Sequence, residues 1–84
     1  MDIGKEMILL KARLSEKKQR REGMIHRADS YIIILREIID PYAEDFTMLN
    51  LDRAVVIMGD FVLLKKEAKK LDEEISRIER EING

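Results

Sequence analysis

The sequence predicts an all-α fold: an antiparallel two-helix hairpin of coiled-coil type that self-associates into a four-helix bundle. Three observations predict it. Apolar residues recur with heptad spacing along two long segments, a proline-containing segment separates them, and the two apolar series match when the chain folds back on itself. One proline and four glycines in 84 residues favour an ordered, helix-rich chain. Residues 1–84 are expected to form a single domain.

The first helix is predicted over about residues 3–39. Apolar residues follow one another at alternating gaps of four and three, and only Lys17 and Arg21 interrupt the series. Such spacing, sustained over more than three heptads, is typical of helices packed along a seam. The aliphatic stems of the two cations can lie over the partner helix while the charges reach solvent. We expect them to leave the open end of the hairpin looser than the loop end. The apolar members are Ile3, Met7, Leu10, Leu14, Met24, Ala28, Tyr31, Leu35, Ile38 and Tyr42.

The second helix is predicted over about residues 51–82, after a hinge at about 40–50. Pro41 cannot continue a helix interior and disfavours helical geometry at Asp40, although the pair also suits the start of one short extra turn. Asn50 suits an N-cap, and Asp52 follows in the first turn, where the helix dipole favours an acid. The unbroken apolar series of this helix is Ala54, Ile57, Phe61, Leu64, Ala68, Leu71, Ile75, Ile78 and Ile82.

The two series predict the register of the hairpin. If the chain folds back about Phe46, residues whose numbers sum to 92 meet, so Tyr31 faces Phe61 and Met24 faces Ala68. Every seam residue then finds a seam residue, with small alanines opposite larger side chains, as close packing requires.

A β-sheet is the competing interpretation of two segments. "AVVIMGDFVLL" (54–64) is rich in β-formers and contains a possible two-residue turn, Gly59-Asp60, and "YIIIL" (31–35) would supply a third strand. Neither segment alternates apolar with polar residues, and the heptad passes through both without losing phase. We therefore favour helices.

Large apolar residues off the seam gather near the loop, where two helices alone cannot cover them. The short hinge offers too few apolar residues to do so. Another chain must cover the surface, most simply a second copy in a symmetric homodimer, with a helix of a different protein as the alternative. The predicted interface consists of Ile32, Ile33, Ile34, Ile39, Val55, Val56, Met58, Val62 and Leu63.

The size and composition of the chain also favour self-association. A chain of this size has a marginal core, and without cysteine it has no disulfide or thiolate metal site to support it, which leaves self-association. Sixteen basic and 17 acidic residues give no global field toward nucleic acid or membrane. The longest apolar runs are five residues, far short of a membrane span, and the N-terminus is not a signal peptide. We expect a cytoplasmic protein.

The basic stretch 11–27 supports a second hypothesis, a helical bundle that binds nucleic acid. A basic helix face neutralises phosphates, although this stretch has no aromatic residue for base stacking. The competing interpretation is that it pairs with the acidic stretch 71–82 and fixes the antiparallel orientation. The candidate residues are Arg13, Lys17, Lys18, Arg20, Arg21 and Arg27.

Catalytic chemistry has little support in the sequence. His26 with Glu22 gives two ligands, which is not a metal site. An acidic group near the hinge, Glu37, Asp40, Glu44 and Asp45, suits a third hypothesis, an all-α metal-dependent enzyme, but it also solubilises an apolar loop. There is no serine–histidine or cysteine–histidine set and no glycine-rich phosphate loop. We expect no catalytic residues, metal or cofactor, and a non-catalytic helical hairpin acting as an interaction scaffold, adaptor or small regulator.

Overall fold

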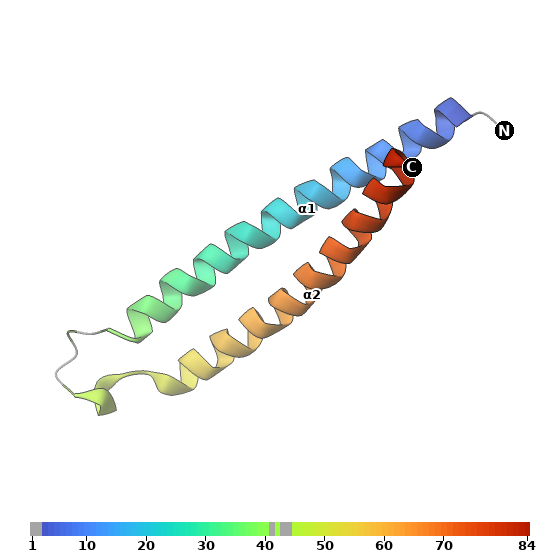
Figure 1. Cartoon of the computed structure of the whole chain (residues 1–84). Helices are drawn as coiled ribbons and strands as arrows, with labels where there is room; N and C mark the ends of the chain where they lie inside the picture. Colours follow the sequence, from blue (N-terminus) through green and yellow to red (C-terminus); the bar gives the residue numbers. More distant parts are fainter. Residues whose placement is uncertain (1–2, 41, 43–44) are drawn as a thin grey trace.

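The computed structural model describes residues 3–40, 42 and 45–84. Two long helices, α1 (Ile3–Ile38) and α2 (Leu51–Asn83), lie antiparallel and pack against each other, and a short 3-10 helix, η1 (Phe46–Met48), lies in the connection (Figure 1). The predicted all-α hairpin is therefore confirmed. The molecule is a rod with extents of 67 × 15 × 15 Å. Its radius of gyration of 19.3 Å far exceeds the roughly 12 Å of a compact domain of this length.

The helix ends lie close to the predicted positions. Asn50 caps α2, and its side-chain oxygen accepts a hydrogen bond from the backbone nitrogen of Arg53 at 3.2 Å. Past the end of α1, the Asp40 carboxylate accepts a bond from the Tyr42 nitrogen at 2.9 Å. The extra turn starts further along the chain than expected: Asp45, not Asp40, is the N-cap of η1 and also accepts from the Thr47 hydroxyl at 3.0 Å. Pro41 lies outside the described residues.

The competing β interpretation is wrong. Residues 54–64 form a continuous part of α2, with Gly59 and Asp60 in mid-helix, and residues 31–35 lie inside α1. The 3.6-residue period buries one stripe of each segment against the other helix, so the heptad outweighs the β-propensity of valine and isoleucine.

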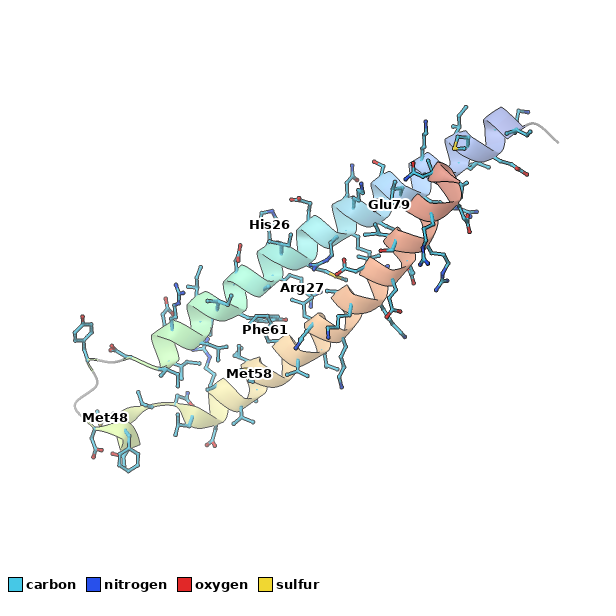
Figure 2. The ribbon with its side chains drawn as sticks, viewed as in Figure 1. His26, Arg27, Met48, Met58, Phe61 and Glu79 are labelled. Carbon is cyan, nitrogen blue, oxygen red and sulfur yellow. The ribbon has the colours of Figure 1, made fainter. Side chains whose placement is uncertain are left out.

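The register agrees with the predicted one at three levels of the hairpin. The ring of Tyr31 meets that of Phe61, which lies between the two helices in Figure 2. Nearer the open end, Lys17 Nζ lies 2.8 Å from Glu74 Oε2 and Arg21 Nε lies 2.8 Å from Asp72 Oδ1. Both acids are next to the seam residues that the register places opposite these cations.

The buried cluster lies in the middle of the rod and extends into its open half, so the two seam cations do not loosen the packing around them as expected. Beyond them, the seam residues Leu10, Leu14, Ile78 and Ile82 are only partly buried. Met24, Leu64, Ala68, Leu71 and Ile75 form the buried cluster, against which Leu14, Ala28, Tyr31 and Phe61 pack. Leu71 and Ile75 are only 3% and 9% exposed although they face the two seam cations. Because Lys17 and Arg21 are held by Glu74 and Asp72, their aliphatic stems stay over the core.

No helix in the described part of the chain has a stretch long and apolar enough to cross a membrane.

Candidate functional site: an apolar surface near the loop

The chain leaves an unusually large surface open to solvent. A compact monomer of 9.9 kDa exposes about 5,200 Å² by the usual size scaling, whereas this chain exposes 6987 Å², about a third more. A standard protein–protein interface covers roughly 800 Å² on each partner. The surplus therefore exceeds what one interface needs.

Most of the predicted interface residues are exposed. Only Ile34 is partly buried, and the exposed fractions of the other eight run from 36% at Ile32 to 71% at Val55. The seam beside them is also incompletely covered, because Leu35, Ala54 and Ile57 are only partly buried. Ile38 is buried close to the loop but stands outside the buried cluster, so the core is less continuous in the loop half.

The connection between the helices does not cover this surface. Of its apolar residues, Tyr42, Phe46 and Met48 are themselves exposed, and only Leu49 is partly buried. Met48 lies at the loop end, beyond the two helices (Figure 2). An intramolecular cap made by the described hinge residues is therefore absent.

The exposed apolar residues do not share one face, because a two-helix rod has two broad sides. Residues seven apart lie on the same side of a helix in this packing. We call one side the Met58 side, and a groove there joins Ile39 of α1 to Leu51, Val55 and Met58 of α2. Near the loop, the Met58 side carries Ile25, Ile32, Ile39, Leu51, Val55, Met58 and Val62.

The opposite side, which we call the Arg27 side, mixes apolar residues with charges. Near the loop it carries Ile34, Val56 and Leu63 together with Arg27, Arg53 and Asp60. Ile33 belongs to neither side, since its heptad position places it on the outer edge of α1. The nine predicted residues are therefore split. Near the loop the Met58 side is the more apolar of the two, with Lys65 beside its seam and Asp29 and Arg36 further out on α1.

The sequence interpretation missed two members of the Met58 side, Ile25 and Leu51. Both are large, apolar and exposed. Their signal was present in the seven-residue series Ile25–Ile32–Ile39 and in the pair Leu51–Met58. They were overlooked because they lie outside the five-residue apolar runs.

The six basic residues proposed for nucleic-acid binding do not form one free face. Lys17 and Arg21 lie at the seam and pair with Glu74 and Asp72. Hydrogen bonding to Asp72 raises the pKa of Arg21. The other four are divided: Lys18 lies on the Met58 side, and Arg13, Arg20 and Arg27 lie on the Arg27 side.

The Arg27 side brings two rows of opposite charge together along most of the rod. Arg13, Arg20 and Arg27 recur every seven residues on α1. On α2 the series with the same spacing starts with Arg53 near the loop and continues with four acids: Asp60, Glu67, Glu74 and Glu81. In the observed register each arginine lies between two of these acids, so opposite charges alternate along this side.

The alternating charges on the Arg27 side contribute to the pKa shifts of two of its residues. A hydrogen bond to Tyr31 is the main cause that raises the pKa of Arg27, and Glu67 and Asp60 add to it. The hydrogen bond from Lys17 chiefly lowers the pKa of Glu74, with a smaller contribution from Arg20. This is the intramolecular pairing that the sequence suggested for the basic stretch.

The candidate metal ligands stay apart. Within the described residues, no three histidine, cysteine, aspartate or glutamate side chains are placed to hold a metal ion. His26 lies on the outer surface of α1, away from α2 (Figure 2). Asp40 and Asp45 serve as turn and cap acceptors for the backbone, and Glu44 lies outside the described residues.

No protein-family model matches the sequence, and no match is found among curated proteins or solved structures. The surface itself is therefore the basis for inferring function.

Proposed function

We propose that the protein is a non-catalytic helical hairpin that self-associates, most simply as a homodimer, and acts as an interaction scaffold, adaptor or small regulator. The observation that carries this proposal is the exposure of eight large apolar residues around an incompletely covered seam in the loop half. Contiguous apolar surfaces of this kind mark interaction sites, and helical hairpins bury them by forming four-helix bundles.

Nucleic-acid binding through residues 11–27 is the weaker alternative. Lys17 and Arg21 pair with acids of α2, and an acidic row lies opposite Arg13, Arg20 and Arg27, so the basic residues do not present a uniformly positive face to phosphates. A metal-dependent enzyme has less support still, because the hinge acids that the structure describes do not come together as a metal-binding group.

The experiment that tests the proposal is sedimentation equilibrium over a wide range of protein concentration. We expect a mass of twice the 9.9 kDa monomer that falls toward the monomer on dilution, with a melting temperature that rises with concentration. A monomer at every concentration would contradict self-association.

A binding titration tests the alternative, nucleic-acid binding. Fluorescent single-stranded and duplex nucleic acids are titrated with the protein at low salt, where phosphate contacts are strongest. We expect no saturable binding. Tight binding, lost when Arg13, Lys18 and Arg20 are changed to glutamine with helicity intact, would favour the nucleic-acid function instead.

A further inference from the structure

We propose that a second copy of the chain packs on the Met58 side with the two loop ends together, so that α1 of each copy lies along α2 of the other. This inference rests on the proposed self-association and adds which side is used and how the copies are oriented. It places the twofold axis along the rod.

The choice of side follows from where charged groups lie. On the Arg27 side the arginine row of α1 lies among acids of α2, and burying that side would remove these charged groups from water at a large cost. On the Met58 side five of the six seam-flanking positions in the loop half are apolar, namely Ile25, Ile32, Ile39, Leu51 and Met58, and the sixth is Lys65. Burying them is favourable.

The orientation follows from the open half of the same side. Here charges of opposite sign stand at matching heights on the two helices: Glu22 of α1 is level with Lys69 of α2, and Lys18 is level with Asp72. Further along, Lys11 is level with Glu79, which Figure 2 shows near the end of α2.

Several of these charges have no partner within their own chain. Among the described residues, Asp72 is bound by Arg21, but Glu22, Lys18 and Lys69 make no ion pair. When two copies stack with their loops together, α1 faces the partner's α2 at the same height. Glu22 then lies close to Lys69 of the partner subunit, and Lys18 close to Asp72 of the partner subunit.

The reverse arrangement, with loops pointing in opposite directions, matches less of the surface. Full overlap would set the apolar loop half of one copy against the charged open half of the other. Partial overlap of the loop halves would leave the complementary charges of the open halves unused. The loops-together arrangement sets the mainly apolar loop halves against each other and places acids opposite bases in the open halves.

The side is tested with two neighbouring residues. Val62 lies on the Met58 side and Leu63 on the Arg27 side, and both are exposed in one chain. We expect Val62→Glu to give a monomer at concentrations where the native protein is dimeric, and Leu63→Glu to keep the dimer. A dimer that survives Val62→Glu but not Leu63→Glu would overturn the choice of side. Circular dichroism confirms that helix content is kept.

The orientation is tested by distance measurement, which leaves the interface intact. The chain has no cysteine, so a single Arg80→Cys variant carries one spin label on the exposed outer edge of α2 near the open end. With loops together the two labels lie across the bundle, within about 30 Å. With opposed, half-overlapping loops they lie about 60 Å apart along the rod. The longer distance would overturn the orientation.

Charge exchange gives an independent check. Glu22→Lys and Lys69→Glu should each weaken the dimer several-fold, and the double exchange should restore it. Equal, additive weakening would overturn the proposed pairing. A native protein that is monomeric throughout would instead refute the self-association itself, so the two failures are distinguishable.

Discussion

Tyr31 and Phe61 meet across the hairpin with their ring centroids 5.6 Å apart and their planes inclined by 42°. The predicted register, in which the chain folds back about Phe46, places these two residues opposite each other on α1 and α2. Their contact lies at the boundary between the buried core and the exposed loop half, so it fixes the register where apolar cover becomes sparse.

We expect this ring pair to contribute specific coupling energy. Tilted aromatic pairs are worth about 0.5–1.5 kcal/mol beyond their buried area. A double-mutant cycle of Tyr31→Leu and Phe61→Leu, followed by urea unfolding, should show coupling of this size. Tyr31→Phe keeps the ring and should keep the coupling with residue 61. Additive single effects would mean that the rings pack as ordinary apolar groups.

Leu71 is, with Leu64, one of the two most buried residues of the core. It is 3% exposed inside the buried cluster, and truncating such a leucine costs about 2–5 kcal/mol. We expect Leu71→Ala to lower the unfolding free energy by this amount, measured at one fixed protein concentration. The control is Ile8→Ala, an exposed site on α1, which should change it by less than about 0.5 kcal/mol. Equal effects at both sites would contradict the placement of the core.

We expect Glu74 to make the free energy of unfolding depend on pH. Its hydrogen bond from Lys17 lowers its pKa. A carboxylate whose pKa is lower in the folded state stabilises the fold above its unfolded pKa, and this contribution is lost as pH falls through the folded value. Glu74→Gln should therefore destabilise the hairpin at neutral pH, with the difference from the native protein shrinking in acid.

Unfolding titrations at several pH values check this expectation. Glu73→Gln, which changes a neighbouring exposed acid on the outer edge of α2, is the matched control and should behave like the native protein throughout. A Glu74→Gln effect that persists unchanged below the titration range of carboxylates would show that the charge of Glu74 is irrelevant.

Asn50 should be required for a well-formed start of α2. Its side chain accepts the Arg53 backbone bond, and replacing such a cap with alanine costs about 1 kcal/mol. Asn50→Ala should lower stability by this amount and speed amide exchange in the first turn. Asn83→Ala, at the other end of α2, should do neither. An unchanged exchange rate at Arg53 would count against the cap.

The glycines within the helices offer a simple probe of the outer surface. A methyl group at Gly23 or Gly59 would meet no atom within 4 Å. Alanine is about 1 kcal/mol better than glycine inside a helix. Gly23→Ala and Gly59→Ala should therefore each raise the melting temperature. A loss of stability at Gly59 alone would reveal a neighbouring chain packed closely against the outer edge of α2.

Much of the fold could be predicted because the heptad, Pro41 and Asn50 are local signals that agree. The tightness of packing along the rod was predicted less well. Lys17 and Arg21 were expected to loosen the open end, but Glu74 and Asp72 hold them over Leu71 and Ile75. That arrangement depends on side-chain positions on the other helix, which the apolar pattern does not encode.

The candidate site was predictable as a group of residues but not as a surface. Ile32, Val55 and Val62 stand out by composition, whereas Ile25 and Leu51 become members only when both helices are placed side by side. The division into a Met58 side and an Arg27 side needs the register as well. The spacing of Arg13, Arg20 and Arg27 becomes meaningful only opposite the acids of α2.

The placement of the loop has one more consequence. The start of α1 and the end of α2 lie toward the end of the 67 Å rod that is remote from the loop (Figure 1). A fluorescent protein or affinity tag fused at either end would therefore be held away from the apolar surface near the loop. The hairpin would then act as a stiff spacer between the fused domain and a chain bound at the loop half.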